Sequence, residues 1–275
     1  MKYLYGKSVF LTGGSSGIGH AAAELFAANG YTVFAASRNP PDNIRSYPGG
    51  GEIRPVTMDV RDPQSVATAV DSVLSQCDAG IVIHCAGMGI ACAAEDYPAE
   101  AVTNLLETNF NGVMRVNSHI LPHFRKRGLG LCVIIGSMAG VFPIPFQSHY
   151  SASKAALDSY SAALRMELRA YGVKVSLVLP GDTNTGFTSA RQYVIDESSP
   201  YYCACIKAVK KMEKDELGGN QPITAARAIL RISSKKKPPS RKIIGLSYKL
   251  LNFLGRLLPD SLIEYILRKM YLGAA

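Results

Sequence analysis

Two side chains four residues apart, Tyr150 and Lys154, have the types and the spacing for acid–base chemistry. Their surroundings have a helical pattern, so the two side chains share one face of a helix. A phenol with its usual pKa of about 10 is a poor base near neutrality. A neighbouring ammonium group favours the phenolate and is expected to lower that pKa. The pair therefore predicts a group that gives a proton to a ketone or takes one from an alcohol.

A serine completes this predicted chemistry. Ser137 ends an apolar run at 131–137, and we expect its hydroxyl to hydrogen-bond the substrate oxygen and polarise the carbonyl. A lone Tyr–Lys pair is common on exposed helices, and a lone strand-end serine is usually structural. The catalytic interpretation therefore depends on finding a cofactor site beside these residues.

The stretch TGGSSGIG, residues 12–19, predicts that cofactor site. It follows the apolar run 8–12 and opens the helical run 16–29, where backbone N–H groups and the helix dipole favour an anion. Gly13 lets the chain turn, Gly17 lets a ligand approach the backbone, and Gly19 lets the helix pack on the sheet. The spacing differs from G-x-G-x-x-G, and a loose glycine turn is the alternative. A dinucleotide pyrophosphate is the favoured ligand, with Ser15, Ser16 and Ile18 also in contact.

The end of the second apolar run, Ser37-Arg38, favours NADP(H) over NAD(H). No acid for a ribose 2′-hydroxyl lies between Glu24 and Asp42, whereas an arginine fork pairs with a 2′-phosphate. The alternative is that Arg38 is a solvated surface side chain. Asp59, followed by Val60, is predicted to accept a hydrogen bond from the adenine amino group or to cap the next helix.

Apolar and helical runs alternate along the chain. Strands are expected at 8–12, 31–37, 53–58, 80–86, 131–137, 173–180 and 241–246, and helices at 16–29, 63–76, 99–127 and 150–171. Strands that are apolar throughout are covered on both faces. The pattern predicts an α/β fold, a single doubly wound domain with a mostly parallel seven-stranded sheet. Residues 182–221 are polar, aromatic and irregular.

Composition excludes several function classes. The net charge of +9 is concentrated at residues 235–275, which hold nine basic and two acidic residues and so carry +7, and no general nucleic-acid surface is expected. None of the six cysteines forms a zinc-spaced cluster, so no metal site is predicted. No apolar run reaches membrane-spanning length. We expect a reducing, cytoplasmic location without disulfides, either soluble or peripheral at a membrane.

In combination these stretches resemble the short-chain dehydrogenases/reductases. The resemblance covers about residues 5–245, through TGGSSGIG, DV at 59–60, CAG at 85–87, Asn109, Ser137, YSASK at 150–154 and PGDTNTGF at 180–187. It implies one Rossmann-type domain with strand order 3-2-1-4-5-6-7. It also implies that Lys154 and Tyr150 bind the nicotinamide ribose and that Asn109 holds a water for proton relay.

The resemblance adds cofactor contacts at two more turns. Ala86 and Gly87 let the cofactor approach the fourth strand, and Pro180 and Gly181 turn the chain beneath the nicotinamide. Thr185 corresponds to the residue that binds the carboxamide, with Thr183 as its competitor, or both threonines merely cap a turn. Cys85 stands where the family usually has asparagine. Since cysteine is a weak donor, local strand bonding is in question.

The resemblance implies that the substrate is selected by residues 182–221, the family's variable lid, and we expect the tail to contribute. Domain boundaries are placed at 1–246, with a lid at about 182–221, and at 247–275 for an amphipathic helical extension. An apolar pocket is expected from six aromatic residues, or else they pack ordinarily: Phe142, Phe146, Phe187, Tyr193, Tyr201 and Tyr202. The sequence resembles most the 17β-hydroxysteroid dehydrogenase-like branch, which includes retinoid and acyl-lipid ketone reductases. The tail is expected on an anionic membrane, over the substrate cleft or against another subunit.

The predicted function is NADP(H)-dependent hydride transfer between nicotinamide and a hydrophobic ketone or secondary alcohol. A ketoacyl-thioester reductase is one alternative, and a non-catalytic NADP-sensing protein is another. Proteins of the second kind usually lack the tyrosine or the lysine. The resemblance implies a homodimer or homotetramer built on the helices near 99–127 and 150–171.

Overall fold

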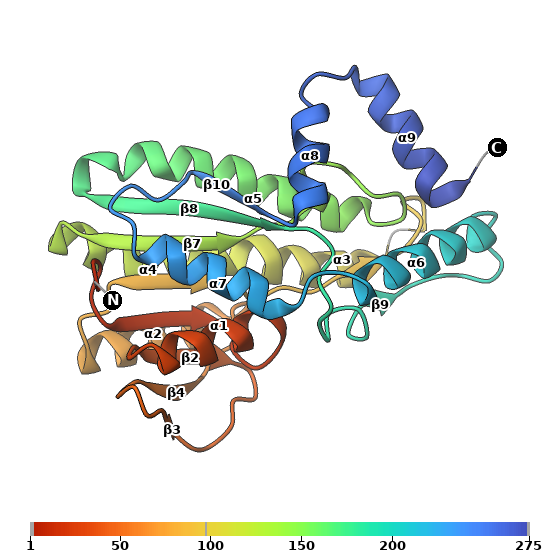
Figure 1. Ribbon diagram of the computed structural model, residues 1–275. Coiled ribbons are helices and arrows are strands. Elements are labelled where there is room, and N and C mark those ends of the chain that lie inside the picture. The colour runs from red at the N-terminus through yellow and green to blue at the C-terminus, as the bar shows by residue number, and fades with distance from the viewer. Residues whose placement is uncertain (1–2, 97, 274–275) are drawn as a thin grey trace.

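The central sheet is the element that all the predicted site residues surround. The computed structural model describes residues 3–96 and 98–273, so residues 1–2, residue 97 and residues 274–275 of the predicted segments lie outside the described residues. In this part of the chain an eight-stranded sheet has the order β10-β8-β7-β5-β1-β2-β4-β3 (Figure 1). Its strands are β1 (Ser8–Thr12), β2 (Thr32–Ser37), β3 (Arg45–Ser46), β4 (Glu52–Thr57), β5 (Ile81–His84), β7 (Gly130–Ile135), β8 (Val173–Pro180) and β10 (Arg241–Ile244).

The predicted strand order 3-2-1-4-5-6-7 is confirmed. All pairings from β10 across to β4 are parallel. The sheet has one strand more than predicted, because the two-residue β3 pairs antiparallel with β4 at the edge. A strand this short carries no periodicity that a sequence reading can detect.

The central strands β1, β5 and β7 are almost wholly buried because helices cover both faces of the sheet, whereas β4 and β10 carry charged residues that are exposed or half-buried. Phe10 of β1 packs on the face covered by α2 (Pro63–Gln76), α4 (Gly112–Arg127) and α5 (Ser148–Glu167). Its neighbours Val9 and Leu11 pack on the opposite face, beneath α1 (Gly17–Ala28) and α7 (Pro222–Ser233). Figure 1 shows α1 and α7 together on one side of the sheet. This alternation buries both faces and leaves the strand ends to form the site.

The helix predicted at 99–127 is continuous but not uniform. It consists of α3 (Ala99–Leu106), a π-helical turn at Glu107–Asn111, and α4. Such turns insert one extra residue per turn and are frequent at functional sites. Asn109 lies in this turn and is fully buried.

The lid is more regular than predicted. Residues 182–221 contain α6 (Tyr202–Leu217) and the short strand β9 (Gln192–Tyr193), which pairs with β6 (Ile90–Ala91). The expectation of an irregular segment was therefore wrong for its second half. The buried residues of α6, Cys205, Ala208, Val209 and Met212, stand at positions i, i+3, i+4 and i+7. This is the spacing of one helix face.

The tail folds back over the carboxyl ends of the strands. It forms α8 (Leu246–Leu254) and α9 (Asp260–Leu272), which meet above the sheet in Figure 1. Leu251 and Leu267 pack against the core, and Tyr271 is buried beside α6. Within residues 3–96 and 98–273, none of the helices has the length and apolar character needed to cross a bilayer.

Candidate active site

A cleft of about 600 Å³ opens at the carboxyl ends of β1, β2, β4, β5, β7 and β8. In open α/β sheets ligands bind outside the carboxyl ends of the strands, where the strand order reverses. Here β1 lies between β2 and β5, so that reversal falls beside the glycine turn. With one exception, the predicted site residues line this cleft: Gly13, Ser15, Ser16, Gly17, Ile18, Gly19, Ser37, Arg38, Asp59, Val60, Ala86, Gly87, Ser137, Tyr150, Lys154, Pro180, Gly181, Thr183 and Thr185.

The glycine turn is specified by backbone contacts. Gly13 has φ of +72°, and a Cβ on it would lie 2.6 Å from the backbone N of Ala86. A Cβ on Gly19 would lie 2.1 Å from the carbonyl oxygen of Gly13. Only glycine fits at either position. The structure thus supports the roles expected of Gly13 in the turn and Gly19 in close packing.

The start of α1 presents unpaired donors to the cleft. Ser16 is the N-cap residue of α1 and makes no side-chain capping hydrogen bond. Gly17 has φ of +54°, and a Cβ on it would lie 3.4 Å from the Cβ of Thr185. The glycine turn and the loop after β8 therefore face each other across a narrow gap. A diphosphate fits this gap chemically, because the first N–H groups of a helix lack intrahelical partners.

At the far end of the cleft an arginine that the sequence analysis missed accompanies Asp59. Arg61 donates to both carboxylate oxygens of Asp59, with Nε 3.0 Å from Oδ1 and Nη2 2.6 Å from Oδ2. Hydrogen bonds from Arg61 hold the pKa of Asp59 below its usual value, with a smaller contribution from the charge of Arg38. Arg38 itself is exposed. Two cations and no acid other than the paired Asp59 therefore border this end.

The alternative role predicted for Asp59, capping the next helix, was wrong. The cap of α2 is Asp62, whose Oδ1 accepts from the backbone N of Gln64 at 2.9 Å. The carboxylate of Asp59 instead accepts from the backbone N of Arg61. It lies in the cleft, where adenine recognition stays a prediction.

Asn109 is the predicted site residue that does not line the cleft itself. Its side chain accepts from the backbone N of Met88 at 2.8 Å and donates to the Met88 carbonyl at 2.9 Å and to Ser153 Oγ at 3.1 Å. A Cβ on Gly87 would lie 3.4 Å from Asn109 Oδ1 and 3.6 Å from Lys154 Nζ. Asn109 thus holds the loop after β5 next to the lysine, while the predicted relay water stays a prediction.

The proton-transfer residues come together on α5 and at the end of β7. Lys154 Nζ lies 5.7 Å from the centroid of the Tyr150 ring and donates to the carbonyl oxygen of Ile135 at 3.1 Å. Ser137 hydrogen-bonds the Tyr150 side chain, which favours the phenolate. Both Tyr150 and Lys154 are at least nine-tenths buried.

The expected lowering of the Tyr150 pKa is not what the structure shows. Burial raises the pKa of Tyr150 to about 12, against a smaller opposing effect of the Ser137 hydrogen bond. Burial also lowers the pKa of Lys154 to about 8. The two residues lie close together as predicted, but desolvation disfavours the charged form of each and is the largest cause of both pKa shifts.

A buried ion pair missed by the sequence analysis adds to this field. Arg191 is almost wholly buried, pairs with Glu216 of α6 and lies 5.8 Å from the Phe187 ring centroid. Arg191 favours the Tyr150 phenolate and Glu216 disfavours it. No sequence spacing links residues 191 and 216, so only the fold reveals the pair.

The loop after β8 holds both candidate carboxamide ligands. Thr183 Oγ1 donates to the carbonyl oxygen of Gly181 at 2.8 Å, and Thr185 Oγ1 accepts from the backbone N of Phe187 at 3.1 Å. Both threonines therefore stabilise turns, as the alternative interpretation states. Both also line the cleft, so the choice between them stays open.

The hydrogen bonds between β1 and β5 are present at Cys85, although the family usually has asparagine at this position. The backbone N of Cys85 donates to the Thr12 carbonyl at 3.1 Å, and the backbone N of Ala86 donates to Thr12 Oγ1 at 3.3 Å. Burial raises the pKa of the Cys85 thiol to about 12. β1 and β5 are thus joined here through Thr12, without an asparagine side chain.

The substrate end of the cleft has apolar side chains as predicted, but its wall differs from the predicted one and also includes the acidic residues Asp182, Asp215 and Glu216. Phe142 and Phe187 line it, whereas Tyr193 and Tyr201 are exposed on the lid surface. Phe146 and Tyr202 are not among the lining residues either. The tail supplies five further lining residues: Tyr248, Leu251, Leu267, Met270 and Tyr271. Of the three positions predicted for the tail, the structure shows the one over the cleft.

Tyr248 fastens the tail to the cleft. Its hydroxyl donates to Asp182 Oδ2, and its ring occupies the space where Gly181 lacks a side chain. Burial raises the pKa of Asp182 above its usual value, and the hydrogen bond from Tyr248 opposes this shift. Pro180 and Gly181 therefore turn the chain directly beneath a tail residue.

Comparison with known proteins agrees with this geometry. The sequence model described as short chain dehydrogenase matches residues 7–193. A 3-ketodihydrosphingosine reductase of Bacteroides thetaiotaomicron is 37% identical over 267 residues, 96% of this chain and 97% of that protein. The ketoacyl reductase HetN of Nostoc sp. is 30% identical over 254 residues, 87% of this chain and 88% of that protein.

Solved structures share the whole fold. A short-chain dehydrogenase from Streptomyces avermitilis superposes with a TM-score of 0.79 at 27% identity, over 96% of this chain and 95% of that one. Family members from Burkholderia phymatum, in complex with NAD, and from Burkholderia cenocepacia, in complex with NADP, give TM-scores of 0.79 and 0.75. At 21% and 20% identity these two show the fold alone.

The finer placement made from the sequence is not supported to the same degree. The curated relatives named above are reductases of a ketodihydrosphingosine and of ketoacyl groups, not hydroxysteroid dehydrogenases. The 17β-hydroxysteroid dehydrogenase-like branch therefore stays a prediction. The match over residues 7–193, the near-full-length relative and the shared architecture establish the coarser level: this chain belongs to the short-chain dehydrogenases/reductases, a family of oxidoreductases.

Proposed function

We propose that this protein is an NADP(H)-dependent reductase of a hydrophobic ketone, with a long-chain acyl-lipid ketone as the substrate class. The observation that carries the proposal is the position of the Tyr150 phenol. It is hydrogen-bonded to Ser137, stands beside Lys154, and lies in a cleft that runs from the glycine turn to an apolar wall. The 3-ketodihydrosphingosine reductase relative favours a lipid over a steroid or retinoid.

The residues at the carbonyl have separate tasks. Ser137 and Tyr150 bind the substrate oxygen, so negative charge that develops on it is stabilised by two hydroxyl donors. The Tyr150 phenol then gives its proton to that oxygen. With its pKa raised to about 12, the phenol is protonated at neutral pH, which favours the reductive direction. Lys154 stabilises the phenolate that remains, while Asn109 holds the neighbouring loop in place.

The cleft fits a nicotinamide dinucleotide on its own geometry. Gly87 leaves a space between Asn109 and Lys154 that a Cβ would enter, and the N-terminus of α1, which has no side-chain cap, faces the same cleft. When bound, the cofactor supplies the hydride. Arg38, together with Ser37 or Ser15, is proposed to bind the 2′-phosphate, and Arg61 keeps the neighbouring Asp59 paired. This arrangement supports NADP(H) over NAD(H).

The cofactor preference is testable by titration. An Arg38→Gln variant is expected to bind NADPH about tenfold to a hundredfold more weakly, since a charge-assisted pair with a phosphate is lost, and to bind NADH unchanged. Arg45→Gln is the matched control, because Arg45 is an exposed arginine paired with Glu24 outside the cleft. Equal loss for both cofactors, or tighter binding of NADH than of NADPH by the unmodified protein, would refute the preference.

Turnover tests the reaction itself. Reduced-cofactor absorbance is followed with 3-ketodihydrosphingosine, a 17-ketosteroid and acetoacetyl-coenzyme A. The expected order places the long-chain amino ketone first. Tyr150→Phe should lower kcat by about 10²-fold to 10⁴-fold, whereas the control Tyr193→Phe, an exposed lid tyrosine, should leave kcat unchanged.

The same panel separates the alternatives. The HetN relative favours the alternative of a ketoacyl-thioester reductase, which would turn over acetoacetyl-coenzyme A faster than the other two ketones. A non-catalytic NADP-sensing protein would bind NADPH without oxidising it with any ketone. Full turnover by Tyr150→Phe would remove the assigned proton donor.

A further inference from the structure

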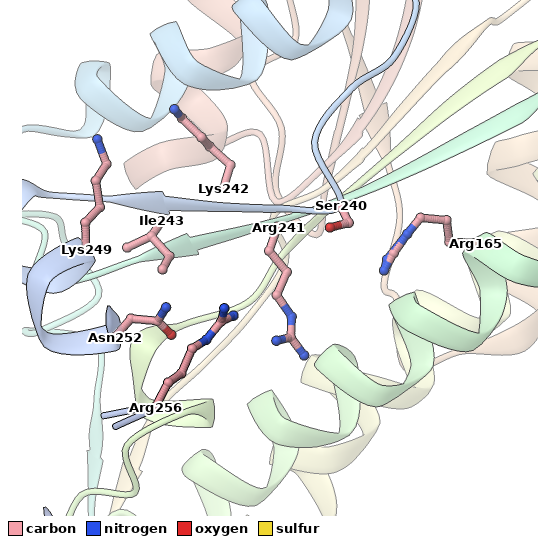
Figure 2. Close-up of a pocket in the computed structure, with 8 residues that line it drawn as sticks. All are labelled: Arg165, Ser240, Arg241, Lys242, Ile243, Lys249, Asn252 and Arg256. Atoms are coloured by element: carbon pink, nitrogen blue, oxygen red, sulfur yellow. The ribbon is translucent and has the colours of Figure 1, made fainter. Parts of the chain in front are cut away.

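A cationic pocket lies outside the cleft, between β10, α5 and α8. It has a volume of about 470 Å³ and is lined by Arg165, Ser240, Arg241, Lys242, Ile243, Lys249, Asn252 and Arg256. Figure 2 shows the guanidinium groups of Arg165, Arg241 and Arg256 on one side of β10, with the Asn252 amide beside Arg256. The ammonium groups of Lys242 and Lys249 extend from the other side.

The positive charge of this pocket is largely uncompensated. Arg241 pairs with Asp158 of α5, with Nη2 2.7 Å from Oδ2. Across residues 3–96 and 98–273, no other lining cation of the pocket takes part in an ion pair. Burial, followed by the charges of Lys249, Lys235 and Arg231, lowers the pKa of Lys242. Like charges crowd here, so an anion would be stabilised.

One donor of the pocket lacks an acceptor. The Nη1 atom of Arg165 is buried and, among the described residues, has no hydrogen-bond partner. A buried donor without a partner is unfavourable unless a ligand or water satisfies it. A phosphate oxygen suits it, because guanidinium and phosphate groups match in charge and in geometry.

The helix that borders this pocket is apolar on two opposite faces. Tyr248 and Leu251 of α8 point into the cleft, and Gly255 after it packs on Phe142. The other face carries exposed apolar side chains spaced four, three and four residues apart: Leu246 (82% exposed), Leu250 (59%), Phe253 (61%) and Leu257 (67%). This spacing puts Leu246, Leu250 and Phe253 in one row along α8, and Leu257 follows in the turn after the helix. Lys249 and Arg256 lie on the flank between the two faces.

The second tail helix repeats this division. Ile263, Leu267 and Tyr271 of α9 pack inward. Leu262, Tyr265, Ile266 and Met270 are exposed. Together with the α8 row they form what we call the outer apolar face. Single exposed apolar residues are normal on protein surfaces, but a run of them along two consecutive helices, with basic residues beside it, is typical of an interaction site.

The chemistry of this surface matches an anionic bilayer. An amphipathic helix with apolar residues on one face and lysine or arginine beside them lies in the plane of the interface. Basic side chains next to that face are attracted to acidic lipids. We propose that the outer apolar face of α8 and α9 lies in the interfacial region of a membrane while the cationic pocket binds the phosphate of an anionic phospholipid.

This docking is independent of the proposed reaction. Met270 both lines the cleft and is 47% exposed, so the same tail that contacts lipid forms the cleft wall. A substrate with long alkyl chains would reach the cleft from that side. Vesicle binding is measured without turnover. The membrane proposal can therefore fail while the proposed reductase function stands, and the proposed reductase function can fail while the membrane proposal stands.

The test is co-sedimentation of the full-length protein with vesicles. One set contains phosphatidylcholine alone, and the other contains equal parts of phosphatidylcholine and phosphatidylglycerol. Binding is expected to the second set and to weaken as salt is raised. Arg165→Gln/Arg256→Gln should bind the anionic vesicles about 30-fold more weakly, at about fivefold per basic residue. The matched control is Lys210→Gln/Lys214→Gln, which removes two exposed charges from α6.

A second pair of variants tests the apolar contribution. Leu250→Ser/Phe253→Ser should weaken vesicle binding at least about tenfold, since two large side chains no longer enter the interface. Met166→Ser/Leu217→Ser removes two exposed apolar side chains elsewhere and should have no effect. All four residues are exposed, so the thermal midpoint checks that each variant remains folded.

Three outcomes would overturn the proposal. The first is equal binding, or none, to both vesicle sets. The second is binding of inorganic phosphate that Arg165→Gln/Arg256→Gln abolishes, without vesicle binding, which would assign the pocket to a soluble phosphate. The third is self-association in sedimentation velocity that Leu250→Ser/Phe253→Ser abolishes, without vesicle binding. This result would assign the outer apolar face to a second copy of the chain.

Discussion

Replacing Lys154 by methionine is expected to stabilise the cofactor-free protein. Lys154 is 5% exposed, and burial lowers its pKa from 10.5 to about 8. At about 1.4 kcal/mol per pKa unit, keeping this lysine charged in the fold costs about 3 kcal/mol at pH 7. Methionine removes that cost but also removes the hydrogen bond to the Ile135 carbonyl, worth about 1 kcal/mol. The net gain in the free energy of unfolding is about 2 kcal/mol.

The stability gained by Lys154→Met is expected to decrease as the pH rises. The pKa of Lys154 is lower in the folded protein than in the unfolded chain, so the cost is complete below about pH 8 and fades as pH rises towards 10.5. The advantage of methionine should therefore fall from about 2 kcal/mol at pH 7 to near zero at about pH 9.5. Tyr150 does not disturb this window. Its raised pKa contributes stability that is present below about pH 10 and is lost only above that.

Urea unfolding at pH 7 and pH 9.5 measures this difference. Lys210→Met is the matched control, because Lys210 is exposed on α6 and its replacement should change stability by less than about 0.5 kcal/mol at either pH. NADPH turnover by Lys154→Met should be lost under the same conditions in which the fold is more stable. The reasoning would be refuted if Lys154→Met were less stable than the unmodified protein at pH 7. It would also be refuted if the difference in the free energy of unfolding between the two proteins did not change with pH.

Three further results are expected. Gly19→Ala should lower the free energy of unfolding by at least about 2 kcal/mol and weaken NADPH binding in titration, because the new Cβ would lie 2.1 Å from the Gly13 carbonyl oxygen. The control is Gly186→Ala, whose new Cβ would have no other atom within 4 Å. An equal loss of stability in the two variants would contradict this reasoning. Tyr248→Phe should lower the free energy of unfolding in urea by about 1 to 2 kcal/mol at pH 7 and by less at pH 4, because the Asp182 carboxylate loses its hydrogen-bond donor. An unchanged free energy of unfolding at pH 7 would contradict this. Size-exclusion chromatography should show a dimer or tetramer, so elution at the 29.5 kDa of a single chain would contradict the expected oligomer.

Local sequence patterns predicted many of the helices and strands. Strands β1 and β8 and helix α2 have the predicted bounds, since each is an apolar or amphipathic run between clear breaks. The π-helical turn at 107–111 was missed, because nothing in its local pattern distinguishes it from the helices on either side. Helix α6 was missed because aromatic and polar residues at its start conceal its buried face, which exists only once the tail packs on it.

The site was predictable where it is contiguous in sequence. The glycine turn and the Tyr150–Lys154 pair come from short stretches whose spacing has a physical meaning. The direction of the Tyr150 pKa shift was not predictable, because it depends on burial by distant segments. The pairing of Arg191 with Glu216 and the contribution of Tyr248 to the cleft join residues far apart in the chain, so neither leaves a sequence signal.

The tail supplies five of the large side chains that line the cleft, and it comes from a different part of the chain than the residues proposed to react. α6, α8 and α9 all lie beyond residue 193, where the match to the family ends. The residues proposed to transfer the proton and hold the nucleotide diphosphate all lie within it. Substitutions in these three helices are therefore expected to change which molecules are accepted, and those at Glu216 are also expected to shift the pKa of Tyr150. A chimaera that carries the α8–α9 tail of another family member is therefore a direct way to change which substrates are accepted.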